Sequence, residues 1–112
     1  MNQECVNFIY GDECKLINHI NLFPLKYDWT SVEHKSNFVV NQKVYTSLQD
    51  FLLNFSHGNY EYKLKLGLWC KFNQDKSLFN ALVMSGSHPL ISDDKQISLY
   101  LMKLREIFYN NI

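Results

Sequence analysis

The sequence predicts an α+β fold in one compact domain, residues 1–112, mostly helical around a small sheet. The apolar share is 46% and includes eight Phe, seven Tyr and two Trp, which is enough side-chain volume for a single core. Three segments carry apolar residues at helical spacings, and one has the composition of a β-hairpin. Neither a Gly/Ser-rich linker nor an internal repeat divides the chain, so we expect one domain.

One strand and an irregular stretch are predicted for the first 38 residues. Val6 to Tyr10, VNFIY, is β-branched and aromatic, and it is followed by Gly11-Asp12, a pattern typical of a strand that ends in a turn. From Lys15 to Phe38 no period dominates and Pro24 interrupts the chain. We expect a long ordered loop or short helical turns there.

A hairpin followed by a helix is predicted for residues 38–55. FVVNQKVY, Phe38 to Tyr45, has two β-prone runs around Asn41-Gln42, and Asn tolerates the left-handed conformation of a tight turn. Thr46 or Ser47 can then cap a helix. Apolar residues recur in this helix at spacings of three and four, at Leu48, Phe51, Leu52 and Phe55.

The second half of the chain contains one ambiguous segment and two clear helices. Within Tyr62 to Leu68, apolar and polar or small residues alternate, which favours a strand. Asp75 to Ser85 predicts a helix that ends before Gly86, which is placed for a left-handed conformation. Asp94 to Tyr109 predicts the last helix. Its apolar positions are Ile97, Tyr100, Leu101, Leu104 and Phe108.

Composition argues against several classes of function. Eleven basic residues balance eleven acidic ones, so binding of nucleic acid through phosphate neutralisation is not indicated. No basic-then-apolar leader and no apolar run of about 20 residues occurs, which predicts a cytoplasmic protein without a membrane span. No glycine-rich phosphate loop is present, and we expect no cofactor.

Cysteine and histidine spacing predicts no metal site. The cysteines are odd in number and form no CxxC pair, and we expect reduced thiols packed as small apolar groups. The histidines lack the paired spacing of a helical metal site. These residues are Cys5, Cys14, Cys70, His19, His34, His57 and His88.

Glu33 and His34 are the first candidates for chemistry. They follow Trp29 in WTSVEH, and a carboxylate beside an imidazole can serve general acid/base catalysis. The alternative is that both are solvent-exposed loop residues. Trp29 and Trp69 could stack on a base or a nicotinamide ring, or they could belong to the core.

Several short motifs occur in the same order as in a known family. Lys71, Phe72, Gln74, Leu78 and Leu82 fit a KF-x-Q element followed by L-x-x-x-L without a gap. VNFIY is similar to an opening I-x-F-Y strand, LYLMKLREIF to a closing L-L-M-x-L-R helix, and KLIN, through Leu16 and Asn18, to L-S-N-F. Together these motifs resemble the NADAR (YbiA-like) family.

The resemblance implies a fold, an activity and a set of ligand-binding residues. NADAR-like proteins are α+β and are linked to cleavage of N-glycosidic bonds in ADP-ribose-related or riboflavin-pathway compounds. The resemblance makes Tyr62 to Phe72 helical, against the alternation, and we expect a helix. It also implies that Asn18, Trp69 and Lys71 bind ligand, with Lys71 steadying a phosphate.

At the family's active centre the resemblance is incomplete. The family carries an aromatic-x-S-x-E-H element, and WTSVEH supplies its letters through Glu33 and His34, although it precedes the hairpin. YTSLQD follows the hairpin, as the family order requires, but has Gln49 for the Glu and Asp50 for the His. A carboxylate can stabilise an oxocarbenium-like state or activate water, and a neutral Gln does neither well.

A second departure lies before the last helix, where the family has a D-x-x-W-G element and a Gly-rich loop and this chain has only SDDKQIS. We therefore expect a catalytically impaired binding or interference protein. Such a protein would suit a bacteriophage, acting in the cytoplasm of its host. It would hold an ADP-ribose-like small molecule or a macromolecular partner such as a host protein. The alternatives are a minimal N-glycosidase that uses Glu33 with His34, or Asp50, and an unrelated small α+β partner-binding domain.

Overall fold

The computed structural model describes residues 3–11 and 23–111. Within these ranges the fold is α+β, as predicted, with helices dominating two short pairs of strands. The elements are α1 Gln3–Tyr10, β1 Leu25–Lys26, the 3₁₀ turn η1 Asp28–Thr30, β2 Lys35–Val40, β3 Lys43–Ser47, α2 Leu48–Asn54, α3 Tyr60–Gln74, α4 Lys76–Met84, β4 Leu90–Ile91 and α5 Lys95–Asn110.

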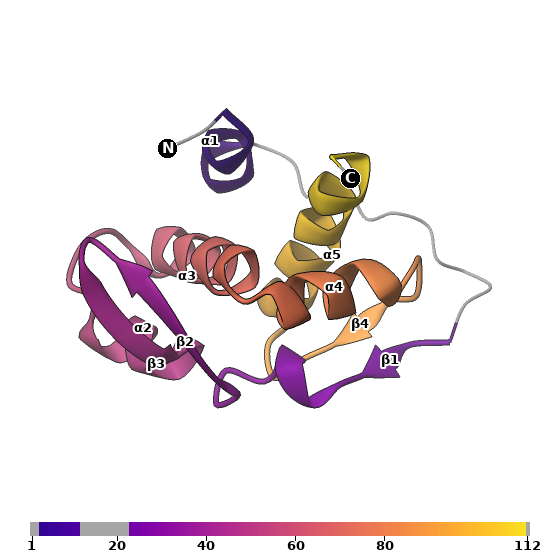
Figure 1. Ribbon diagram of the computed structural model, residues 1–112, viewed down its shortest axis with the longest axis horizontal. Helices are drawn as coiled ribbons and strands as arrows, with labels where there is room; N and C mark the ends of the chain where they lie inside the picture. The colour runs from indigo at the N-terminus through magenta and orange to yellow at the C-terminus, as the bar shows by residue number, and fades with distance from the viewer. Residues whose placement is uncertain (1–2, 12–22, 112) are drawn as a thin grey trace.

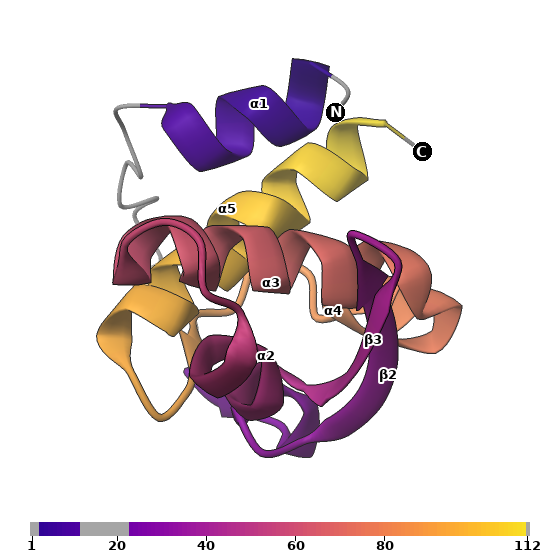
Figure 2. The same ribbon diagram turned by 90° about the vertical axis from the view of Figure 1, so that its left-hand side faces the viewer.

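Helix α3 lies at the centre of the molecule (Figures 1 and 2) and contacts α1, α2, α4, α5 and β2. In Figure 1 the β2–β3 hairpin and α2 lie at one end of the long axis, and the parallel pair β1–β4 lies at the other. Gly67 lets α2 approach this central helix closely. A Cβ added at Gly67 would lie 2.6 Å from Leu48 Cδ1 and 2.8 Å from Phe51 Cδ2.

The predicted hairpin and the helix after it are confirmed. Asn41 and Gln42 have φ angles of 52° and 69°, the left-handed pair that a two-residue hairpin turn requires. Ser47 is the residue that caps α2, because its Oγ accepts a 3.0 Å hydrogen bond from the amide of Asp50. Beneath the hairpin the rings of Phe38, Tyr45, Phe51 and Phe55 pack together.

The alternation in residues 62–68 predicted the wrong structure, and the helix implied by the family resemblance is present. Asn59 caps α3 by accepting a 2.8 Å hydrogen bond from the amide of Tyr62. The alternation is misleading because Lys65 and Gly67, which a strand would have turned to solvent, are buried together with Leu64 and Leu68. A helix with neighbours on several sides has no single apolar stripe.

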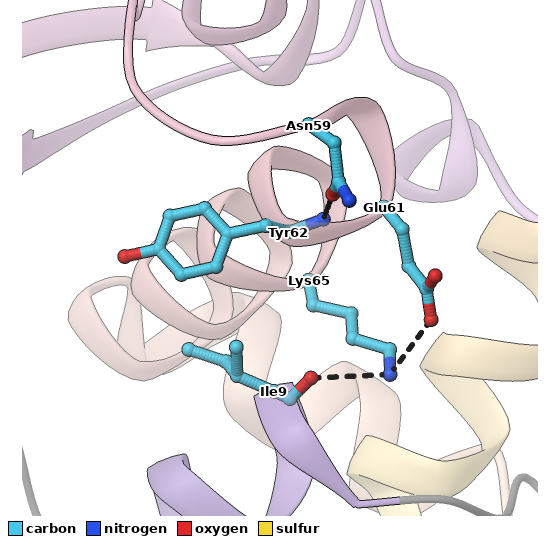
Figure 3. A network of polar contacts seen from close by, with 5 residues as sticks. All are labelled: Ile9, Asn59, Glu61, Tyr62 and Lys65. Atoms are coloured by element: carbon cyan, nitrogen blue, oxygen red, sulfur yellow. Dashed lines mark hydrogen bonds and ion pairs between the residues drawn. The ribbon is translucent and has the colours of Figure 1, made fainter.

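The predicted strand at Val6 to Tyr10 is also wrong, because these residues belong to α1. Cys5, Phe8 and Ile9 are buried at spacings of three and four, so packing on α3 and α5 overrides the local β preference. Lys65 fixes the end of α1, as Figure 3 shows: its Nζ donates to the carbonyl of Ile9 at 3.2 Å and pairs with Glu61 at 3.3 Å. A cation at a helix C-terminus is favourable for the helix dipole.

Both helices predicted in the second half are confirmed, each with an aspartate cap. Asp75 accepts from the amides of Ser77 and Leu78 at the start of α4, and Asp94 accepts from the amide of Gln96 at the start of α5. Gly86 has φ 70°, the left-handed conformation expected after α4. All five predicted apolar positions of α5 are buried.

The irregular stretch predicted for Lys15 to Phe38 is described only from residue 23 onward. It contains the short strand β1, the turn η1 and the beginning of β2, in partial agreement with the expected loop and helical turns. Strand β1 pairs in parallel with β4, and Thr30 donates to the carbonyl of Ile91 at 2.8 Å. Among the described residues, no helix is both long and apolar enough to cross a membrane.

Gly67→Ala should destabilise the protein by about 1–2 kcal/mol, because the new methyl group must displace Leu48 and Phe51, which are 1% and 0% exposed. Alanine favours a helix over glycine by roughly 1 kcal/mol, so the packing cost must exceed that gain. Urea unfolding measures the effect, with Gln96→Ala at an exposed position of α5 as the control. Equal or higher stability of Gly67→Ala would contradict the close approach of α2 and α3.

Candidate functional site

The two candidate placements of the family's active-site motif lie beside each other. The amide of Gln49, at the start of α2, donates to the carbonyl of Val32 at 2.9 Å. WTSVEH and YTSLQD are therefore joined through their backbones, although the hairpin separates them in sequence. The first of the two segments contributes Ser31, Glu33 and His34 to a hollow in the surface, whose lining contains no residue of the second.

That hollow is an open depression of about 550 Å³, which we call the acidic depression. Its lining residues are Lys26, Tyr27, Asp28, Thr30, Ser31, Glu33, His34 and Asp93. Asp93 joins the linker before α5 to this region, because its Oδ2 accepts from Ser31 Oγ and from the amide of Val32, each at 3.1 Å. Three carboxylates and one lysine therefore line this hollow in a chain with no net charge.

His34 forms part of the wall of the acidic depression. Its Nδ1 is buried and has no hydrogen-bond partner among the residues that the structure describes. Burial, followed by the nearby charge of Lys71, lowers the pKa of His34 below its usual value. Both members of this predicted pair, His34 and the exposed Glu33, line the acidic depression.

Lys71 lies beneath the depression and does not line it. Its side chain is 1% exposed, and its Nζ donates a 3.0 Å hydrogen bond to the backbone carbonyl of His34. Burial lowers the pKa of Lys71 to about 8. In this position the amine supports the loop that carries Glu33 and His34, and it has no access to a phosphate in the depression.

Two further side chains at the end of α3 hold strand β2. The amide group of Gln74 donates to the carbonyl of Val39 and accepts from its N–H, both at 2.7 Å. Asp75 accepts from Ser36 Oγ at 2.7 Å, and its hydrogen bonds to Ser77 and Ser36 lower its pKa. We call Lys71, Gln74 and Asp75 the α3 clamp. The sequence motif contains Lys71 and Gln74, but nothing in it indicates that they bond to β2 and to His34, the residue before it.

Asp50 and Gln49 lie at the start of α2, and neither of them lines the acidic depression. Asp50 accepts from the amide of Thr46 at 2.9 Å and from Asn54 Nδ2 at 2.7 Å, and the Thr46 hydrogen bond lowers the pKa of its carboxyl. Its oxygens are therefore used at the start of α2. Gln49 is exposed and is absent from the lining of the acidic depression.

The tryptophans and Asn18 complete the predicted residues. The Trp69 ring lies between Phe8 and Phe108, with centroid distances of 6.1 and 6.0 Å, so Trp69 packs with the core rather than in the depression. Trp29 stacks on Tyr27, a lining residue, at 4.8 Å. Asn18 lies outside the described residues, as do Cys14 and His19.

Neither metal nor thiol chemistry is supported in residues 3–11 and 23–111. No group of three or more His, Cys, Asp or Glu side chains there could hold a metal ion. Cys5 is buried, and burial raises the pKa of the Cys70 thiol to about 12, so that Cys70 is protonated at neutral pH. Both have the character of small packed apolar groups.

Comparison with known proteins identifies no relative. No protein-family model matches this chain, and no curated protein or solved structure matches it at a significant level. The NADAR-like interpretation accordingly rests on the sequence motifs alone.

The buried amine of Lys71 predicts an unusual dependence of stability on pH. Between its folded pKa of about 8 and its ordinary value of 10.5, the unfolded chain binds more protons than the folded chain at this residue. The free energy of unfolding of the wild type, relative to Lys71→Met, should therefore rise by about 3 kcal/mol from pH 7.5 to pH 10.5.

Urea unfolding of both proteins at several pH values measures this difference. Comparison with the variant cancels the titration of other groups, including the thiols. Lys95→Met, which alters an exposed lysine, is the matched control and should follow the wild type. A constant difference between wild type and Lys71→Met across the range would show that the amine is not buried.

Proposed function

We propose that this protein is a non-catalytic binding protein that holds a positively charged group of a macromolecular partner in the acidic depression. The observation that carries this proposal is the set of three carboxylates around one hollow, from Asp28, Glu33 and Asp93. Complementary charge selects partners and accelerates their encounter. A guanidinium or ammonium group matches this lining.

The absence of catalysis in this proposal follows from how the candidate residues are used. Lys71 bonds a backbone carbonyl below the surface, and Asp50 bonds the backbone at the start of α2. Gln49 has a neutral amide, whereas an N-glycosidase needs an ionised carboxylate to stabilise its transition state. These contacts stabilise the fold and leave little machinery for bond cleavage.

The charge of the depression favours a basic partner over an ADP-ribose-like ligand. A diphosphate carries negative charge, and like charges brought together without counter-charges are unfavourable. Lys26 is the lining lysine, and three carboxylates oppose it. Within this proposal the chain is a shortened NADAR-like domain kept for binding or interference, and a host protein in the cytoplasm is the expected partner if the chain comes from a bacteriophage.

A second candidate function is a minimal N-glycosidase that uses Glu33 and His34. It is favoured by the placement of both residues in the same open depression. The lowered pKa of His34 also favours the neutral imidazole, which is the form that can accept a proton. The two functions differ in ligand charge, which makes them separable by experiment.

The test is an NMR titration of ¹⁵N-labelled protein with N-acetyl-arginine amide, alongside N-acetyl-citrulline amide as an uncharged control of the same shape. We expect shifts of amides in residues 26–34 and at Asp93 with the arginine derivative alone, weakened by added salt. Glu33→Gln should reduce the response. ADP-ribose should give no shifts there, and chromatography should detect no cleavage of NAD.

Two results would contradict the proposal. Equal shifts with arginine and citrulline derivatives would show that the carboxylates do not select charge. Cleavage of NAD or of an ADP-ribosylated nucleotide that disappears in Glu33→Gln would establish the N-glycosidase instead.

A further inference from the structure

A second hollow of different character lies between β4 and the start of α5. It is an apolar groove of about 460 Å³, which we call the β4–α5 groove. Its lining residues are Leu90, Ile91, Ser92, Lys95, Ser98 and Leu99. Ile91 is 43% exposed, whereas Leu90 is buried, because successive side chains of a strand point to opposite faces.

The groove and the acidic depression are neighbours. Thr30 lines the depression, and its Oγ1 donates to the carbonyl of Ile91, a groove residue, at 2.8 Å. Ser92, on the groove, donates back to the carbonyl of Thr30 at 2.7 Å. The next residue, Asp93, belongs to the lining of the depression. In Figure 1, β1 lies beside β4.

The backbone between the two hollows is held in place before any partner binds. Thr30 is 3% exposed and bonds residues on both sides of the β1–β4 pair. Asp93 is fixed by Ser31 and Val32, and Asp94 caps α5. A surface whose backbone is ordered in advance loses little conformational entropy on binding.

We infer that the β4–α5 groove and the acidic depression form one binding surface for an extended segment of a partner protein, with an apolar side chain in the groove and a basic side chain in the depression. The inference rests on the proposed function and adds the partner's chemistry. Charge complementarity identifies the occupant. The carboxylates of Asp28, Glu33 and Asp93 outnumber the amines of Lys26 in the depression and Lys95 in the groove, so the surface matches a basic, partly apolar peptide and disfavours the phosphates of a nucleic acid.

The spacing of the two anchors follows from the geometry of an extended chain. Groove and depression meet across residues 91–93. Each residue of an extended peptide advances about 3.3 Å, so the apolar and basic side chains should lie within about four residues of each other. One buried aliphatic or aromatic side chain would anchor the segment, and the basic side chain would set its register.

Selection from a library of random twelve-residue peptides displayed on phage, against the immobilised protein, tests the inference. We expect enriched peptides to place Leu, Ile, Met or Phe within about four residues of Arg or Lys. Fluorescence polarisation of one enriched peptide then measures its Kd. Ile91→Glu should weaken binding at least 10-fold by placing a charge in the groove, and Glu33→Lys should do so by reversing charge in the depression.

Glu106→Lys on the exposed face of α5 is the matched charge reversal and should leave the Kd unchanged. Circular dichroism verifies that each variant is folded. If basic peptides are enriched without an apolar preference and Ile91→Glu binds normally, the groove is not part of the surface and the inference fails, while the proposed function stands. Enrichment of acidic peptides, or of none, would overturn both.

Discussion

The hydrogen bond from the buried amine of Lys71 to the carbonyl of His34 is the contact on which the candidate site depends. Burying an amine costs free energy unless the amine is hydrogen bonded. The bond to the His34 carbonyl supplies that partner for Lys71 and thereby holds the carbonyl in place. Gln74 and Asp75 extend the same restraint along β2 through Val39 and Ser36. The α3 clamp thereby positions the loop that carries Glu33. Hydrogen bonds within the loop alone would restrain it less.

The contact that Lys71 makes is structural and does not involve a ligand in the depression. A lysine with a lowered pKa is often found at a catalytic centre, but such shifts also arise in structural networks. Here the amine faces a backbone carbonyl, and the surface above it is lined by carboxylates. The surface next to that lining, at Ile91, is apolar. Acidic and apolar elements placed side by side are suited to recognising a protein segment.

Local sequence signals predicted the features whose hydrogen bonds join residues a few positions apart in the sequence. The hairpin turn at Asn41-Gln42 and a helix cap at Thr46 or Ser47 are local features, and both were predicted. The failures at Val6 to Tyr10 and Tyr62 to Leu68 have one cause: burial is decided there by distant neighbours. The same holds for the site, where Glu33 and His34 could be identified from their chemistry, but the contacts of Lys71 and Gln74 cross more than 30 residues.

Amide hydrogen exchange at Val39 tests the α3 clamp most directly. Its N–H lies on the edge of a two-stranded sheet and donates to the Gln74 side chain. The account predicts slow exchange of this amide in the wild type and at least roughly tenfold faster exchange in Gln74→Ala, with amides in the centre of α5 unchanged. Equal exchange of the Val39 amide in the two proteins would contradict the claim that α3 holds β2.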